Sequence, residues 1–398
     1  MVSGRWLPCS PLALLVLGLL ATVAGGGLLL TWDRAVPETT HAAGLGAGMS
    51  LGAPDTGTPT PAPTQSPTPI SKGWLQRVNF HRAAAKLPPI TQVNHSWSEG
   101  CWAHARYTVK NNVSGHSEEP DDPWYTAEGH ACAKSANVWG SWIIAKSDED
   151  AIDTWMQGPF HAVGILDPAL LETAYGSYRE ANGGLQMGAA LDVIRGLGSI
   201  PDYVDFPIAW PSDGMTTPLR RHVGERPNPL TSCPGYEAPT GLPVILQVGS
   251  GLTTLTVTSH SFMRDDIQLE HCVFDGTNYY HPDSSEQNLG RAILSARDAI
   301  VLIPREPLIS GAEYRVSIEV NDEHYSWSFA VSAPGDVNCD HAVTIVDAQL
   351  IAQLIVGRVS GLPCAKNGDV NESGGVTIAD AQLIAQLIVG RIPSLPPP

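Results

Sequence analysis

Oxygen-bearing side chains recur at one spacing in two segments near the C-terminal end of the chain. They fill positions 1, 3, 5, 9 and 12 of each segment, namely Asp336, Asn338, Asp340, Thr344 and Asp347 in the first and Asp369, Asn371, Ser373, Thr377 and Asp380 in the second. This is the spacing of an EF-hand calcium loop, in which position 7 contributes a backbone carbonyl, here that of Ala342 or Gly375. Because Ca²⁺ takes many oxygen ligands at flexible distances, a loop that wraps around the ion is needed to supply them. We therefore expect two Ca²⁺ sites, one in each segment.

Each of these segments leads into an almost identical helical sequence. Residues 344–358 (TIVDAQLIAQLIVGR) recur as residues 377–391 (TIADAQLIAQLIVGR), differing only in Val346 against Ala379. Position 12 is Asp instead of the Glu of an ordinary EF-hand, and one helix follows each loop. In these respects residues 335–391 resemble the dockerin family, calcium-dependent modules that dock onto cohesin domains. The resemblance implies a cohesin-type protein domain as partner.

The two repeats differ at the sixth position of the loop. His341 stands there in the first loop, whereas Gly374 in the second makes the sharp turn more easily, so we expect the first site to be weaker or slightly distorted. In the first helix an apolar stripe lies at the spacing of a buried face, and we interpret it as packing rather than as partner surface: Leu350, Ile351, Leu354 and Ile355.

Cysteines also indicate an exported protein. Six of the 7 Cys follow an apolar N-terminal stretch and can pair evenly. Cys339 lies in the first loop and Cys364 lies between the repeats, so we expect a disulfide that joins these two. The pairing of the other four stays open: Cys101, Cys132, Cys233 and Cys272.

A second candidate site comes from residues 116–129 (HSEEPDDPWYTAEG) and 151–168 (AIDTWMQGPFHAVGILDP). In this order the motifs resemble the CAP superfamily, the SCP or pathogenesis-related-one-like fold. That resemblance implies an α-β-α sandwich whose open cleft holds His116, Glu128 and His161, and in some members a divalent metal such as Zn²⁺. Gly158 stands where a second family Glu is expected, which weakens a metal site and any acid–base mechanism. Hydrogen-bonded histidines with a purely structural role remain the alternative.

Shifts in composition divide the chain into parts that position these residues. Arg5 precedes an uncharged apolar stretch over residues 12–30, so residues 1–35 are either a signal peptide or an N-terminal membrane anchor. Residues 36–71 form a Pro- and Thr-rich linker. We expect a multidomain protein with a CAP-like domain over 72–234, an all-β Ig-like sandwich over 240–332 and a small α-helical dockerin domain over 335–398.

Apolar periodicity predicts the elements of these domains. Residues 78–87 and 97–111 are expected to be helical and residues 184–194 to form a strand. Short strands separated by turns are expected over 243–248, 253–259, 299–304, 312–320 and 324–331. Alternating apolar and polar residues in the last two favour a half-buried antiparallel sheet.

Charge narrows the class of partner. The net charge of -17, from 23 Lys and Arg against 40 Asp and Glu, repels phosphate backbones and argues against nucleic acid. The leading interpretation is an extracellular or cell-surface binding protein, attached to a cohesin-type partner and in contact with the membrane only through its N-terminal segment. The alternative is a dockerin-bearing extracellular hydrolase acting on polysaccharide or cell-wall glycan, although no recognisable catalytic motif supports it. Surface adhesion through an uncleaved anchor is a third possibility.

Overall fold

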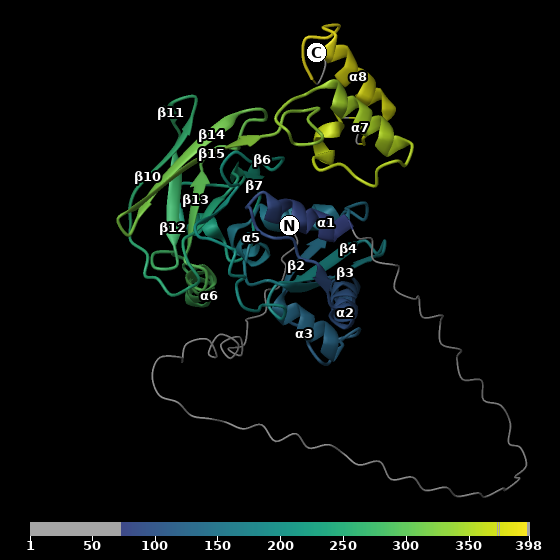
Figure 1. The fold of residues 1–398 in the computed structure, drawn as a ribbon. Helices are drawn as coiled ribbons and strands as arrows, with labels where there is room; N and C mark the ends of the chain where they lie inside the picture. Colours follow the sequence, from purple (N-terminus) through teal and green to yellow (C-terminus); the bar gives the residue numbers. More distant parts are fainter. Residues whose placement is uncertain (1–72, 372, 374, 396–398) are drawn as a thin grey trace, which may run out of the picture. The chain divides into compact units, whose positions relative to one another are not determined.

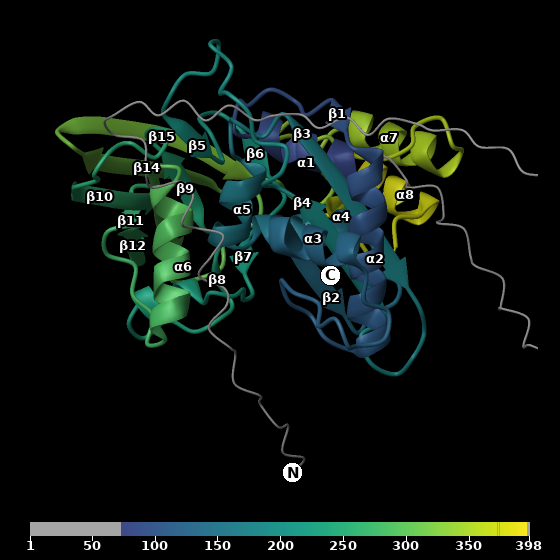
Figure 2. The same ribbon diagram turned by 90° about the horizontal axis from the view of Figure 1, so that it is seen from below.

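The computed structural model describes residues 73–371, 373 and 375–395 (Figures 1 and 2). The expected signal peptide or anchor, the Pro- and Thr-rich linker and Gly374 therefore lie outside the described residues. Within the described ranges, no helix is both long enough and apolar enough to span a bilayer.

A four-stranded sheet lies at the centre of the N-terminal part. Its order is β1 (Gln92–Val93), β3 (Glu172–Arg179), β4 (Met187–Asp192) and β2 (Ala136–Ser141), with β1 parallel to β3 and the other neighbours antiparallel. Helices α2 (His95–Asn111) and α3 (Ala127–Ser135) cover one face. The other face carries α1 (Gly73–Ala83), α4 (Asp148–Met156) and α5 (Pro159–Ile165). The result is three layers, helix, sheet and helix.

Alternation along β3 assigns its side chains to these two faces. Tyr175 points to the α1 face and stacks on Trp74, with 5.0 Å between ring centroids. Its neighbour Gly176 points to α2, where a Cβ atom would lie only 2.0 Å from the backbone nitrogen of Trp102. Gly188 of β4 is under the same constraint from the carbonyl oxygen of Ala105, at 2.4 Å. The two glycines therefore permit the close packing of α2 on the sheet.

Two further sheets form the β-rich part. One has the order β11 (Ile267–Gln268), β10 (Val257–Arg264), β14 (Glu313–Val320), β15 (Glu323–Val331) and β6 (Thr216–Thr217). The other has the order β12 (His271–Asp275), β13 (Ala299–Pro304), β9 (Val244–Gln247) and β5 (Ile208–Trp210). Strands β7 (Arg221–His222) and β8 (Thr240–Gly241) pair separately. In β14 the residues Tyr314, Val316, Ile318 and Val320 are buried, as the predicted alternation requires.

Two short strands that precede residue 234 pair with strands of the later part of the chain. Strand β5 pairs with β9 and strand β6 pairs in parallel with β15, so residues 208–217 belong to the two later sheets. Helix α6 (Ser284–Ser295) was not predicted from the sequence. It follows its N-cap residue Asp283 and packs on β12 and β13. One continuous apolar core extends from Trp74 to Val331 and joins the layered part to these sheets.

The C-terminal part has a core of its own. Helices α7 (Ile345–Ile355) and α8 (Ile378–Ile388) pack together, and the short helix η4 (Ala365–Gly368) lies between them in sequence (Figure 1, yellow). Ile351 and Ile384, at equivalent positions of the repeats, are fully buried in this core. Small cores of this kind rarely supply much stability unaided, so additional links matter.

The described residues form three disulfides, and one of them links the C-terminal part. Cys339 is bonded to Cys364 inside the C-terminal part. Cys101–Cys132 joins α2 to α3, and Cys233–Cys272 joins the end of the short helix η3 (Pro229–Ser232) to β12. The two cysteines are 31 positions apart in Cys101–Cys132 and 39 positions apart in Cys233–Cys272. These pairings therefore depend on the folded chain.

Candidate functional site

The histidines of the N-terminal part meet at one place. His116, in the loop between α2 and α3, stacks on His161 of α5 with ring centroids 6.5 Å apart. His116 Nδ1 donates to the carbonyl oxygen of Ala133 at 3.2 Å, and His161 Nδ1 donates to Glu225 Oε2 at 2.6 Å. Because carbonyl and carboxylate oxygens only accept, the Nδ1 atom of each ring carries a proton. Partial burial and nearby His161 lower the pKa of His116, although its exposed edge lets water screen part of the effect.

The carboxylate bonded to His161 is Glu225 and not Glu128. Glu128 lies in the first turn of α3 with an exposed side chain, and the partner of His161 is Glu225, which follows β7. Glu225 also accepts hydrogen bonds from the backbone nitrogens of Phe160 and His161, at 3.1 and 3.2 Å, and so caps α5. Glu225 lies 64 residues from His161 in sequence, and no local motif predicts that these two residues are in contact.

Gly158 has a structural explanation. It is the N-cap residue of α5 and offers no side-chain cap. A Cβ atom at Gly158 would come within 2.5 Å of Glu225 Oε2. The missing side chain therefore leaves the space that the Glu225 carboxylate fills.

A second histidine–carboxylate pair is buried beside α2. His104 Nδ1 lies 3.0 Å from Glu118 Oε1, and both side chains are almost completely buried. The other carboxylate oxygen of Glu118 accepts a hydrogen bond from the backbone of Thr126 at 3.0 Å. His104 is therefore a residue of the core.

Zn²⁺ does not fit the cleft. Around His116 and His161, the described residues bring no group of three or more His, Cys, Asp or Glu side chains together in a way that could hold a metal ion. The expected third member, Glu128, points to solvent, and Glu225 already accepts three hydrogen bonds. We therefore derive no step through a metal in this cleft.

The acidic loops of the C-terminal part share a different geometry. In the first loop Asp347 is buried; its Oδ1 accepts from the backbone of Val337 at 3.0 Å and its Oδ2 from that of Thr344 at 2.8 Å. In the second loop Asp380 accepts from Asn371 and Thr377 at 3.2 and 2.8 Å. The last carboxylate of each loop thus also caps the helix that follows.

Asp336 shows that the first loop suits a cation. Its side chain is buried, and its Oδ2 atom has no hydrogen-bond partner among the described residues. Burial, together with the charges of Asp347 and Asp340, raises the pKa of Asp336. Buried carboxylates that repel one another are stabilised by a bound cation. The first loop therefore fits Ca²⁺, which when bound would neutralise this repulsion, with the side chains at its positions 1, 3, 5 and 12 as oxygen donors.

The same segment matches a known domain family. Residues 334–389 match the family described as dockerin type I domain. These residues form a dockerin type I domain. The match covers only the C-terminal part and assigns no family to residues 73–333.

Two solved structures are similar to a small part of this chain. Two structures from Acetivibrio cellulolyticus match, each of the third cohesin ScaC in complex with the ScaB dockerin displaying a type I interaction. With the dockerin mutated in its N-terminal helix, identity is 30%, coverage is 16% of this chain and 90% of that chain, and the TM-score is 0.16. With the mutation in the C-terminal helix, identity is 31%, coverage is 15% of this chain and 85% of that chain, and the TM-score is 0.15. The comparison with curated proteins found no match.

Part of the apolar stripe on the first dockerin helix differs from the expectation. Ile351 is buried, and Leu350 and Leu354 pack against the dockerin core. Ile355, expected to be a core residue, is 48% exposed. The dockerin core is only one helix pair thick, so it has no second layer to cover this side chain.

Replacing His341 by Gly is expected to raise the free energy of unfolding of the dockerin by about 1 kcal/mol. His341 has φ 72°, a left-handed conformation that a side chain disfavours and Gly tolerates. Calorimetric unfolding of the Ca²⁺-saturated protein measures the change. The control is His341→Ala, which keeps the Cβ atom and should gain little; equal stabilisation by both variants would contradict the explanation.

Proposed function

We propose that the dockerin attaches this chain to a cohesin-type domain of an extracellular partner protein, and that residues 73–332 are the binding module it carries. The observation that carries the proposal is a matched pair of exposed apolar faces on the two dockerin helices. Val356 and Val389, which occupy the same position of the two repeats, are 68% and 67% exposed. Exposed apolar surface of this kind is typical of sites that bind another protein.

Each face is built from the same residues. Ile345 and Ile355 on α7, like Ile378 and Ile388 on α8, expose more than two fifths of their surface. Because residues 347–358 and 380–391 are identical in sequence, the two helices present the same chemistry to a partner. Either face alone therefore supplies a complete docking surface.

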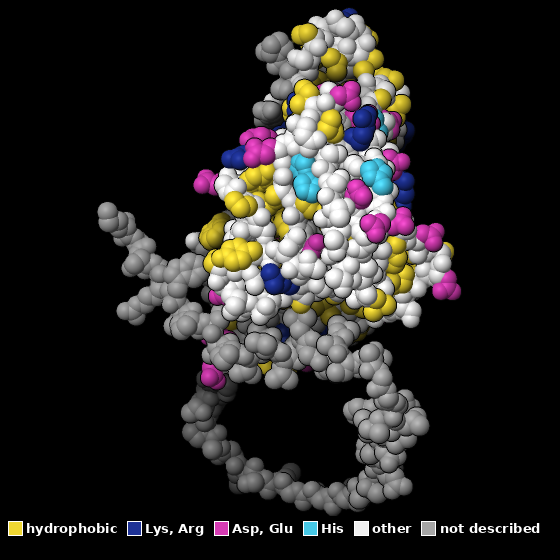
Figure 3. Space-filling view, turned by 90° about the vertical axis from the view of Figure 1, so that its left-hand side faces the viewer, with side chains coloured by type: hydrophobic (Ala, Val, Ile, Leu, Met, Phe, Trp, Pro, Cys, Tyr) yellow, Lys and Arg dark blue, Asp and Glu magenta, His cyan; other side chains and the backbone are white. Residues whose placement is uncertain are grey.

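The cargo we propose is a CAP-like binding domain joined to a β-sandwich. The three layers around the sheet β1-β3-β4-β2 and the stacked pair of His116 and His161 support the CAP-like part. Three disulfides support an oxidising, extracellular location. The face shown in Figure 3 carries separated Lys and Arg side chains rather than a continuous basic patch. It therefore lacks the basic surface that is typical of nucleic-acid binding.

Binding to a panel of type I cohesin domains tests the proposal. In Ca²⁺ we expect at least one cohesin to bind the full chain, and chelation to abolish the complex. Val356→Asp or Val389→Asp alone should change the affinity by no more than about twofold, because the other face remains. Both changes together should weaken binding by at least about a hundredfold, since each buries an aspartate against apolar surface.

The matched control is Leu252→Asp, which places the same charge on a side chain that is 92% exposed in the β-rich part. This variant should bind like the original chain. Unchanged affinity in the double Val variant, or no binding by any cohesin in Ca²⁺, would contradict the proposed attachment.

A further inference from the structure

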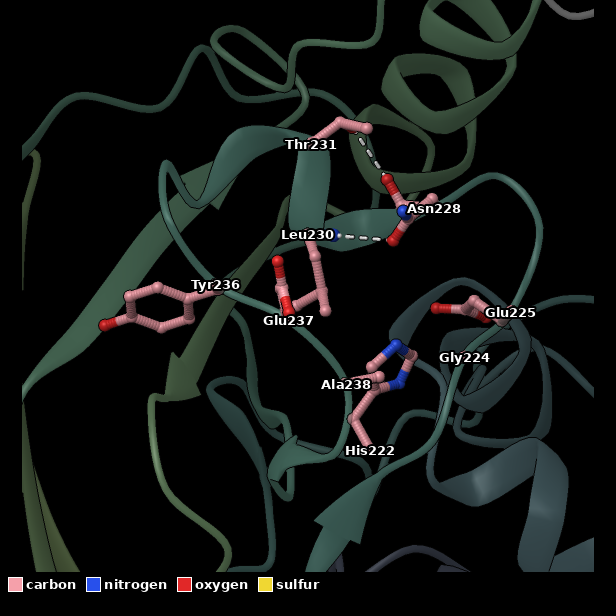
Figure 4. A pocket seen from close by; sticks show the side chains of 9 residues that line it. All are labelled: His222, Gly224, Glu225, Asn228, Leu230, Thr231, Tyr236, Glu237 and Ala238. Atoms are coloured by element: carbon pink, nitrogen blue, oxygen red, sulfur yellow. Dashed lines mark hydrogen bonds between the residues drawn. The ribbon is translucent and has the colours of Figure 1, made fainter.

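A single loop lines an open pocket outside the dockerin. Residues 223–239 leave the β7 strand and return at β8, where Arg221 pairs with Gly241 and His222 with Thr240. The Cys233–Cys272 disulfide fixes the far part of this loop to β12. The cavity holds about 470 Å³ and is lined by residues between His222 and Ala238 (Figure 4). This volume is in the range of pockets that take small organic ligands.

A histidine with an unused acceptor atom lies at the inner end of the pocket. His222 is fully buried, and its Nδ1 lies 2.8 Å from the carbonyl oxygen of Gln157. A carbonyl oxygen only accepts, so Nδ1 carries the proton and the Nε2 of the neutral ring carries a lone pair. That Nε2 has no partner among the described residues. Figure 4 shows the ring directed toward the space between Leu230 and Glu225.

The remaining wall is acidic and partly apolar. Glu225 and Glu237 line the pocket, and its nine lining residues include no Lys or Arg. The Glu225 carboxylate is already held by the start of α5 and by His161, whereas Glu237 is exposed and free to turn toward a ligand. Leu230, Tyr236 and Ala238 supply apolar contact. Acceptors and negative charge therefore predominate over donors.

We propose that this pocket binds a small organic cation through a primary ammonium group. One N–H of the ammonium donates to His222 Nε2, which satisfies the buried acceptor, and the Glu237 carboxylate balances the charge at the mouth. The carbon skeleton of the ligand lies against Leu230 and Ala238. An anion would meet two carboxylates here, and a neutral alcohol of the same shape would lose the charge interaction. This site does not depend on the dockerin or on its partner.

Saturation-transfer NMR with the full chain tests the site with three probes of similar size at neutral pH: n-butylammonium, n-butanol and butyrate. We expect saturable binding of n-butylammonium only. His222→Asn keeps a donor for Gln157 in the place of Nδ1 but removes the Nε2 acceptor, and it should weaken binding at least about tenfold. Glu237→Gln should weaken binding by about three- to tenfold, because it removes only a partly solvated charge.

Glu313→Gln provides the control, since it makes the same charge change on an exposed residue of β14 outside the pocket. It should leave the affinity for n-butylammonium unchanged. Equal binding of n-butanol, binding of butyrate, no saturable n-butylammonium signal, or full affinity in Glu237→Gln would each overturn the proposal. If His222→Asn lowers the thermal stability of the protein, the exposed Glu237→Gln variant still gives the decision.

Discussion

Removal of Ca²⁺ is expected to lower the free energy of unfolding of the dockerin by about 4 kcal/mol for each occupied site, relative to protein in a thousandfold excess of the ion over its Kd. The reason is clearest in the first acidic loop, where the buried carboxylates of Asp336 and Asp347 repel each other. The apolar core around Ile351 and Ile384 is small, so it offsets little of this repulsion. Differential scanning calorimetry with and without chelator measures the effect.

Tryptophan fluorescence separates the dockerin from the rest of the chain. None of the 11 Trp lies in residues 335–398, so the fluorescence transition reports on the other parts alone. Chelator should move only the calorimetric transition that the fluorescence does not follow. The Cys339–Cys364 disulfide should keep the chelated dockerin from unfolding fully.

Asp336→Asn gives the sharpest control, because its effect on the stability of the dockerin should have opposite signs in the presence and absence of Ca²⁺. In chelator the variant should be the more stable protein, since the amide removes one of the mutually repelling charges. In Ca²⁺ it should be the less stable, since a ligand charge is lost. Destabilisation in both conditions, or a dockerin transition indifferent to chelator, would remove the Ca²⁺ assignment.

Replacing Asp153 by Asn is expected to lower the free energy of unfolding of the N-terminal part by about 3–5 kcal/mol. Asp153 of α4 is 1% exposed and accepts from Arg77 of α1 through both carboxylate oxygens, at 2.5 and 3.0 Å. His81 donates a further hydrogen bond at 2.8 Å. The amide would leave the Arg77 guanidinium, itself 9% exposed, buried without its counter-charge.

The ionisation of this cluster is set by its surroundings. Burial would raise the pKa of Asp153, but Arg77 and the hydrogen bond from His81 outweigh burial and hold that pKa well below its usual value. Burial lowers the pKa of His81 to about 4, so the ring is neutral at pH 7 and donates through Nε2. The carboxylate is therefore ionised wherever the protein is folded near neutral pH, and the charge that the Asn variant removes is a full one.

Urea unfolding followed by tryptophan fluorescence measures the loss at Asp153. Asp202→Asn, the same change on an exposed side chain, should stay within about 0.5 kcal/mol of the original protein. The double change Asp153→Leu and Arg77→Leu should recover part of the loss, because it removes both charges from the interior. A loss below about 1 kcal/mol for Asp153→Asn would show that the ion pair contributes little.

The sequence by itself determined the features whose parts lie close together in the chain. The ligand positions of each calcium loop fall within a dozen residues, and the duplicated helices make the pattern hard to mistake. Strands β9, β13, β14 and β15 and helix α2 were predictable because apolar periodicity is a local property, whereas only the second half of α1 was anticipated. His116 and His161 were also identified from short motifs, and the rings lie together.

The tertiary structure alone decided which distant groups meet these residues. Glu225 reaches His161 because β7 pairs with β8 and returns a loop to the start of α5, and Gly158 leaves the room; neither contact has a signal in the local sequence. The same pairing buries His222 and leaves its Nε2 unpartnered in the pocket. Strands β5 and β6 join sheets whose other strands follow more than thirty residues later, and no local pattern predicted this pairing. Contacts of this kind depend on long-range strand pairing and on a shared core, which local residue preferences do not specify.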